Sequence, residues 1–171
     1  MTYKNLPKDH EAYFDFTYLT LDQKGYWAGL LDGEGCLRMD ICSGAPLPSI
    51  AVKMTCEKTI QKWADTFGLN ASIRNRKGMK DHWKDCYSAR MTTHKAAKLC
   101  EAILPYFVTK QDVAKEMAEH YVKECEVCKE KFWQYNGIHT CSKECQHIRK
   151  LGMTREYNYQ RYHADKKKTS D

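Results

Sequence analysis

The chain has 171 residues and a mass of 20.0 kDa, enough for one medium-sized domain with a small appendage but not for two large domains. It carries 28 Lys and Arg against 22 Asp and Glu, and the formal net charge of +6 permits a polyanionic partner. No apolar run approaches the roughly 18 residues of a membrane span. Because residues 1–16 also lack the apolar core of a signal peptide, we expect a soluble protein with no membrane partner.

The nine cysteines indicate a metal site and not a disulfide scaffold. Their number is odd, and five of them are scattered through segments that are predicted to be strands or helices. The other four are bunched near the end of the chain. This pattern is typical of a reducing, intracellular compartment. The scattered cysteines are Cys36, Cys42, Cys56, Cys86 and Cys100.

The first predicted element is a helix over residues 21–34. Thr20 and Gln23 have the spacing of a capping box at its start. Three glycines follow at intervals of four residues, and each costs about 1 kcal/mol relative to alanine inside a helix. Glycines at this spacing line one helix face and allow another backbone to approach closely. They are Gly25, Gly29 and Gly33.

Period-two and helical patterns then alternate. Two strands around residues 36–41 and 49–55 are expected to flank a Pro/Gly loop over 43–48, and a helix over 60–67 is expected to end at Gly68. A second pair of strands is predicted around 72–76 and 86–91. A helix over 96–103 is expected to end at Pro105, and Thr109 is predicted to cap a last helix that reaches Tyr121.

This order predicts an α+β fold: one antiparallel four-stranded sheet, with helices on one face and the other face open. Alternation places mostly basic and hydroxyl side chains on the open face, with Asp40 as its one acid. A solvated face normally mixes charges, so the bias indicates a sheet that lies on nucleic acid, with an ordinary wet face as the alternative. The predicted face comprises Arg38, Ser49, Lys53, Thr55, Ser72, Arg74, Arg76, Ser88 and Arg90.

The first helix ends in two carboxylates, Asp32 and Glu34. Acids at a helix C-terminus oppose the backbone dipole, and a cation would reverse that penalty. Mg²⁺ is commonly held by one or two carboxylates together with phosphate oxygens, so this helix end is a candidate metal site for phosphodiester chemistry. The alternative is that both acids face water.

Residues 27–35, WAGLLDGEG, resemble the LAGLIDADG motif of homing endonucleases, with identity at Ala28, Gly29, Leu30, Asp32 and Gly35. The resemblance continues through the order of strands and helices to residues 104–110, LPYFVTK, which look like the family's PYL-x-x-K segment with Phe107 in place of Leu. Such a core covers residues 20–123. The resemblance implies an αββαββα fold with a DNA-binding four-stranded sheet.

The family resemblance also implies partners and roles. One motif in the chain implies a homodimer in which Gly25, Gly29 and Gly33 allow two motif helices to pack, on a long, roughly palindromic DNA site. Glu34 takes the family's catalytic acidic position, where most members carry Asp, and would hold Mg²⁺, with Mn²⁺ or Ca²⁺ as substitutes. Lys110 matches the basic residue near the cleaved bond. The third member of the site would be Thr55, Cys56 or Glu57.

The resemblance also assigns the sheet to DNA recognition. Arg74 and Arg76 fall where the family reads base edges, and an arginine can grip guanine with two hydrogen bonds. The other predicted DNA-binding residues are placed by alternation alone. They are Arg38, Lys53, Ser72, Ser88 and Arg90.

The bunched cysteines have the spacing C-x2-C-x12-C-x3-C, which predicts a structural zinc site of four thiolates. Ser142 is a natural N-cap that would put the last cysteine in the first turn of a helix, and His139 and His147 are expected to be bystanders. The ligands would be Cys125, Cys128, Cys141 and Cys145. Residues 146–168 mix basic and tyrosine side chains, so they are either a helix that touches DNA or a solvated end.

The chain therefore divides into an N-terminal extension (1–19), an endonuclease core (20–123) and a zinc-binding module with a basic tail (124–171). The leading hypothesis is a site-specific, Mg²⁺-dependent double-strand DNA endonuclease. The alternative is a non-cleaving DNA- or RNA-binding protein on the same scaffold, such as an intron maturase or a transcription regulator, with RNA the less favoured ligand. A zinc-dependent adaptor would leave the acidic helix end unexplained.

Overall fold

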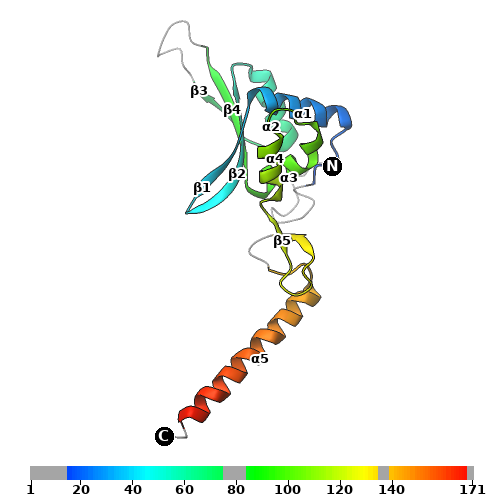
Figure 1. The fold of residues 1–171 in the computed structure, drawn as a ribbon. Helices are drawn as coiled ribbons and strands as arrows, with labels where there is room; N and C mark the ends of the chain where they lie inside the picture. The colour runs from blue at the N-terminus through cyan, green and yellow to red at the C-terminus, as the bar shows by residue number, and fades with distance from the viewer. Residues whose placement is uncertain (1–14, 75–83, 135–138, 169–171) are drawn as a thin grey trace. The chain divides into compact units, whose positions relative to one another are not determined.

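The structure, a computed structural model, describes residues 15–74, 84–134 and 139–168. The chain divides into two compact units, residues 1–120 and 121–171, whereas the sequence placed the division after residue 123. Each unit is described by itself below (Figure 1). No helix in the described ranges has both the length and the apolar composition of a membrane-spanning segment.

The first unit has the predicted order of elements, and its sheet is antiparallel throughout with the strand order β1-β2-β4-β3. The predicted α+β, αββαββα fold with a four-stranded antiparallel sheet is therefore confirmed. The elements are α1 (Leu21–Glu34), β1 (Gly35–Cys42), β2 (Ala45–Met54), α2 (Glu57–Phe67), β3 (Ala71–Arg74), β4 (Cys86–Thr92), α3 (Thr93–Ile103), the 3-10 turn η3 (Leu104–Tyr106) and α4 (Gln111–Glu119).

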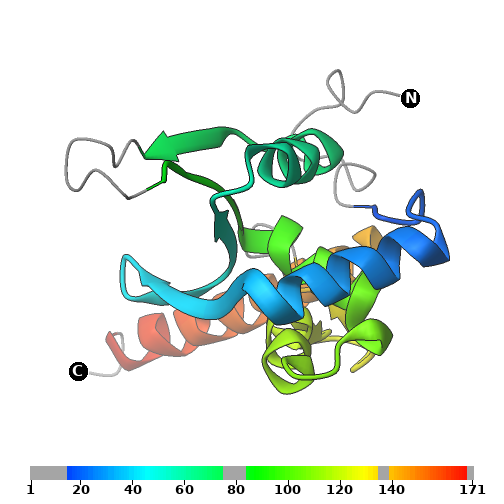
Figure 2. The ribbon, with the colours of Figure 1, turned by 90° about the horizontal axis from the view of Figure 1, so that it is seen from above.

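The helices of this unit gather on one side of the sheet (Figures 1 and 2). An aromatic cluster lies between them: the rings of Trp27 and Trp63 are 5.3 Å apart, and both rings contact Phe67. Phe16 packs edge-on against Phe67 at 5.6 Å, so the end of the N-terminal extension belongs to the core. Ile50 and Val52 complete the core from the sheet and are fully buried.

Two local predictions are confirmed at the helix ends. Thr20 and Gln23 form the capping box at the start of α1, with reciprocal side-chain and backbone hydrogen bonds of 3.0 and 3.3 Å. Gly68 ends α2 in the left-handed conformation with φ of 58°, which costs glycine nothing. The sequence therefore specifies these two ends locally.

The predicted loop over residues 43–48 is wrong. Only Ser43 and Gly44 form the turn, with φ of 51° and 81°, and residues 45–48 continue as part of β2. Pro46 and Pro48 are tolerated there because this half of β2 pairs only with β1, while pairing with β4 begins at Ser49. Proline is compatible with a strand where one edge is unpaired.

The second unit consists of a short antiparallel hairpin and a long helix. Its elements are β5 (Val122–Glu124), β6 (Lys131–Trp133) and α5 (Lys143–Lys168). The Oγ of Ser142 accepts a hydrogen bond of 3.2 Å from the backbone N–H of Cys145, so the predicted N-cap is confirmed. The cap places Cys145 in the first turn of α5.

Candidate functional site

Asp32, in the last turn of α1, is bound to the start of α4. Its carboxylate accepts hydrogen bonds from the backbone N–H groups of Val108, Thr109 and Lys110 at 2.7, 3.2 and 3.0 Å, and from the Thr109 hydroxyl at 2.9 Å. Although burial favours the neutral acid, these bonds lower the pKa of Asp32 below its ordinary value. Asp32 is thus a remote cap for α4, and both of its oxygens already accept hydrogen bonds there.

The predicted cap at Thr109 is therefore wrong. Lys110 occupies the N-cap position of α4 without a side-chain cap, and the Thr109 hydroxyl donates to Asp32 instead. A carboxylate accepts hydrogen bonds more strongly than a hydroxyl and also favours the positive end of the helix dipole. An acid that is distant in the sequence therefore replaces the local cap.

The side chain of Lys110, at the start of α4, caps the end of α1 in return. Its ammonium donates to the backbone carbonyls of Leu31, Asp32 and Gly35 at 2.7, 2.8 and 2.6 Å. An ammonium has three N–H donors, so all of them are used at the C-terminal end of α1, where unpaired carbonyls and the negative dipole end attract a cation. The two helix ends therefore cap each other, and we call these contacts the reciprocal cap.

Glu34 stands beside the reciprocal cap at the last position of α1. Its side chain is exposed, and within the described ranges its carboxylate has no hydrogen bond or ion pair. Gly35 follows at once as the first residue of β1, and a Cβ at this position would lie 2.7 Å from the Leu31 backbone. The helix therefore turns into the strand without a linker, and a free carboxylate is held at a defined backbone position.

The three candidates for a further site residue lie between β2 and α2. Thr55 is exposed in the connection, and Cys56 is the N-cap of α2, where its sulfur accepts a 3.2 Å hydrogen bond from Thr59. That bond and the backbone N–H of Thr59 lower the pKa of Cys56. Glu57, the third candidate, is the first residue of α2. Partial burial, together with the Glu57 carboxylate, raises the pKa of Tyr87. The choice among the three stays open.

The register of the strands brings the predicted open-face residues together. Ser49 faces Arg38 on one side and Thr92 on the other, and Lys53 pairs with Ser88, which pairs in turn with Ser72. Directly paired positions share a face of an antiparallel sheet. The register puts Arg74 opposite Cys86 and Arg90 opposite Ala51 on this same face, whereas Arg76 lies outside the described residues.

Asp40 organises the basic residues at one end of this face. It forms ion pairs with Arg38, at 2.6 Å, and with Arg90, whose Nε also donates to the buried Ser49 hydroxyl at 2.9 Å. Partial burial opposes ionisation, but the hydrogen bond from Ser49 and the two guanidinium charges lower the pKa of Asp40 overall. Two arginines are therefore held side by side by one acid. At the other end of the face, the hydroxyls of Ser72 and Ser88 are 2.8 Å apart.

The glycine face of α1 is open. A Cβ built at Gly25, Gly29 or Gly33 would meet nothing within 4 Å, while Trp27 and Leu31 are buried on the opposite side of the helix. Among the described residues nothing packs on this face, so the described part of the chain gives no packing reason for the three glycines. Leu21 and Tyr26 are also exposed on α1, at 71% and 45%.

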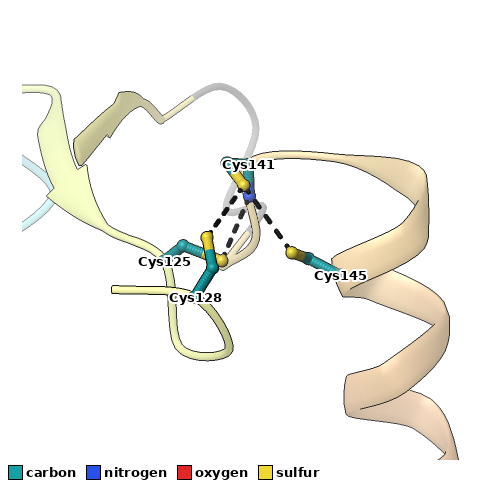
Figure 3. A group of neighbouring side chains, drawn as sticks. All are labelled: Cys125, Cys128, Cys141 and Cys145. Carbon is teal, nitrogen blue, oxygen red and sulfur yellow. Dashed lines mark hydrogen bonds between the residues drawn. The ribbon is translucent and has the colours of Figure 1, made fainter. Parts of the chain in front are cut away.

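The four predicted zinc ligands converge (Figure 3). Their sulfur atoms all lie within 4.8 Å of one another, with Cys128 to Cys141 at 3.4 Å and Cys141 to Cys145 at 3.7 Å. A tetrahedral Zn²⁺ with bonds of about 2.3 Å separates its sulfurs by about 3.8 Å. The geometry fits zinc. Nδ1 of His139 lies 3.2 Å from a Glu126 oxygen, in a polar contact outside the cluster.

The electrostatics of the cluster also fit a cation. Burial opposes the thiolate, but backbone N–H groups of Cys128, Cys141 and Val127 lower the pKa of Cys125 to about 6. The hydrogen bond with Cys128, burial and the other thiols raise the pKa of Cys141 to about 12. Without a cation the cluster thus favours the thiolate of Cys125 and disfavours those of Cys128 and Cys141, and a bound Zn²⁺ would stabilise all four thiolates.

No protein-family model matches the chain, and no curated protein was found to match it. Among solved structures, the chain is similar to the homing endonuclease I-CvuI in complex with its target and Ca, with 20% identity, a TM-score of 0.42, and coverage of 54% of this chain and 60% of that chain.

Two further solved structures are similar. The archaeal intron-encoded homing endonuclease I-Vdi141I, complexed with DNA, has 14% identity, a TM-score of 0.44, and coverage of 57% of this chain and 65% of that chain. The LAGLIDADG meganuclease I-AabMI, bound to uncleaved DNA, has 16% identity, a TM-score of 0.42, and coverage of 56% and 34%. In each case the match spans less than two thirds of the other protein.

Proposed function

We propose that the chain is a divalent-metal-dependent DNA endonuclease of the homing type, which binds duplex DNA on the open face of its sheet. The observation that carries the proposal is the exposed carboxylate of Glu34, which has no partner among the described residues and lies at the end of α1, beside the reciprocal cap and directly before the first strand of a basic sheet. The structure gives Asp32, the other acid of the motif, a capping role, which leaves Glu34 as the acid available for chemistry.

The residues fit a hard divalent ion only if two chains meet. One carboxylate with neighbouring backbone oxygens is a weak Mg²⁺ site, whereas two carboxylates and substrate phosphate oxygens are a common one. The open face of Gly25, Gly29 and Gly33 supports a homodimer in which two α1 helices pack and two Glu34 residues approach. When bound there, Mg²⁺ would supply charge stabilisation for hydrolysis of a phosphodiester bond.

The remaining residues position that carboxylate and the DNA. Lys110 stays a predicted catalytic residue. The contribution that its contacts support is the fixing of the α1 terminus, because its three donors are bound to carbonyls. Arginine and lysine residues on the sheet would contact phosphates and base edges, and the two-fold axis would favour a roughly palindromic target. The proposed set is Arg38, Lys53, Arg74, Arg90 and, by sequence alone, Arg76.

The test is the pair of variants Glu34→Gln and Glu116→Gln. Glu116 is an exposed acid on α4, so its loss matches the charge change away from the site. The proteins are incubated with a randomised plasmid library with and without Mg²⁺. Omission of the ion is preferable to a chelator because a chelator would also strip the cysteine cluster.

We expect the Glu116→Gln variant and the natural chain to cut the library in Mg²⁺, and Glu34→Gln to lose about 100-fold or more of the rate while it retains DNA binding. Full cutting by Glu34→Gln would remove Glu34 from the site. Tight DNA binding without any cutting by the natural chain would favour the alternative, a non-cleaving binding protein of the maturase or regulator type.

A further inference from the structure

Helix α5 carries most of the net positive charge of the protein. Its 26 residues contain eight Lys and Arg and three acids, which gives +5 of the formal net charge of +6. The remainder of the chain is therefore almost neutral in sum. A polyanion would be attracted chiefly to this helix at long range.

In the part of the chain that the structure describes, the first two turns of α5 contact the rest of its unit. Cys145 joins the cysteine cluster, Ser142 caps the helix, and Arg149 forms an ion pair with Glu126 of the knuckle between β5 and β6. From Lys150 to Gln160 every side chain is exposed. The cluster thus acts as an anchor for a helix whose later turns are uncovered in this chain.

Local forces do little to keep those later turns helical. Gly152, Thr154 and Asn158 are poor helix formers, and a helix that is polar on all sides needs a partner or many favourable side-chain pairs. One such pair is a 3.5 Å hydrogen bond from Gln160 to Glu156. A bound partner would supply the missing stabilisation.

Four of the eight cations of α5 recur along one face. Residues at helical intervals of 4, 3, 4, 3, 4, 3 and 4 from Lys143 share a face. Six of the eight positions are cationic or hydroxyl-bearing, the other two are His147 and Ala164, and none is acidic. We call the six the basic face of α5: Lys143, Lys150, Thr154, Tyr157, Arg161 and Lys168. By the same intervals Glu144 and Glu156 fall on other sides, whereas Asp165, four residues after Arg161 and three before Lys168, lies on this face in its last turn.

We propose that the basic face of α5 is a second DNA-binding element, which contacts the phosphate backbone of a duplex. A helix of this length extends for about 39 Å at 1.5 Å per residue, close to one turn of B-DNA of about 34 Å. Lysine, arginine and hydroxyl side chains are the usual donors to phosphate oxygens. The proposal depends on the proposed function in one respect, because it takes the ligand of α5 to be the same DNA duplex that the sheet is proposed to bind.

The distribution of apolar side chains on α5 favours DNA over a lipid surface as the ligand of this helix. A helix that lies on a membrane segregates its apolar residues on one side. Among the exposed apolar side chains, Ile148 and Leu151 are three residues apart and share one side of α5, whereas Met153 and Tyr157 are four apart and share another. The ordered feature of the helix is its cationic face.

Two full-length double variants with the same loss of charge test the proposal. Lys150→Gln with Arg161→Gln removes two cations from the basic face, and Arg155→Gln with Lys166→Gln removes two from the opposite side. Binding to a mixed-sequence DNA duplex of about 40 base pairs is measured by fluorescence anisotropy over a salt series, without Mg²⁺. Circular dichroism checks that both variants retain their helix.

We expect the basic-face variant to bind about tenfold or more weakly and to lose about 2 from the slope of log K against log salt, since each phosphate contact contributes about 0.9. The opposite-face variant should retain the slope within about 0.5. Equal losses in the two variants, or no loss in either, would overturn the proposal. Tighter, basic-face-dependent binding to duplex RNA or to anionic phosphatidylserine vesicles would overturn it in favour of that ligand.

A third variant keeps this test separate from the proposed function. Arg38→Gln with Arg90→Gln removes two cations of the sheet and leaves α5 intact. If the sheet does not bind DNA, this variant is unaffected while the basic-face variant still weakens. If α5 does not bind DNA, the sheet variant alone weakens.

Discussion

The two units of the chain are stabilised in different ways. The first unit encloses a continuous apolar core built around Trp27, Trp63 and Phe67. In the described part of the second unit, the buried residues are Cys125, Thr140 and Cys145, and two of these three are predicted metal ligands.

This difference has a physical basis in size. A unit of about 50 residues buries too small a fraction of its surface to fold securely without a metal, a disulfide or a partner. The four converging thiols of the second unit supply the place for a metal, while the first unit needs none for its fold. We therefore expect removal of the metal to destabilise the second unit, and mutations of the core or of the helix caps to destabilise the first.

The largest expected effect comes from loss of the metal. Chelation, or Cys128→Ser with Cys141→Ser, should unfold the second unit, because structural zinc contributes about 10 kcal/mol or more of folding free energy in such modules. The helical signal of α5 should fall, and proteolysis should cut after residue 120, while the thermal transition of the first unit persists.

The matched control is Cys36→Ser with Cys42→Ser, two exposed thiols on β1. It should leave zinc content, measured by atomic absorption, and the helical signal unchanged. A purified chain without zinc that keeps α5 and resists proteolysis would contradict the comparison between the units.

Disruption of the reciprocal cap should have the next largest effect, confined to the first unit. Lys110→Met leaves three carbonyls at the end of α1 without their charged donor, and we expect a loss of about 2–4 kcal/mol in the free energy of unfolding. Lys115→Met on α4, an exposed lysine, is the control and should change stability by less than about 0.5 kcal/mol. Equal stabilities of the two variants in urea unfolding would refute a capping role.

The acid side of the same cap predicts a pH dependence. The folded pKa of Asp32 is lowered, so its contribution is present above the unfolded pKa, near 3.8, and is lost as the pH falls through the folded pKa. Stability of the first unit should therefore decline below about pH 4, and Asp32→Asn should be less stable at neutral pH with a smaller decline. Unfolding curves at pH 7 and pH 3 for both proteins measure the difference.

The helix ends and strand ends of the first unit differ in how far they can be predicted from the sequence. The capping box of Thr20 and Gln23 and the stop at Gly68 depend on neighbours within four residues, and both are predicted correctly. The continuation of β2 through Pro46 and Pro48 depends on which edge is unpaired, which no local pattern contains. Local rules also favour Thr109 as a cap, whereas the acid that caps α4 lies 77 residues away.

The site is predictable in its residues but not in all its roles. Asp32 at a helix C-terminus and Lys110 at a helix N-terminus each oppose the dipole of their own helix. Taken as a pair, two such charges of opposite sign predict an exchange of caps, and this was the signal available in the sequence. The spacing of the four cysteines, in contrast, predicts the cluster because their short clasps are local.

The smallest effect on stability, with a measurable effect on binding, is expected at Asp40. Asp40→Asn should change the unfolding free energy of the first unit by less than about 1 kcal/mol, because exposed ion pairs contribute little. The same change removes the acid that holds Arg38 and Arg90, so affinity for a mixed-sequence duplex should rise by about three- to tenfold at low salt. Since the pKa of Asp40 is lowered, the acid is ionised in the natural chain at neutral pH, and Asp40→Asn removes one full negative charge at that pH.

The control is Asp22→Asn at the start of α1, which makes the same charge change away from the sheet and should leave the affinity for DNA unaltered. If Asp40→Asn instead weakens binding, the acid serves to orient the two arginines toward DNA, and its ion pairs belong to recognition and not to restraint.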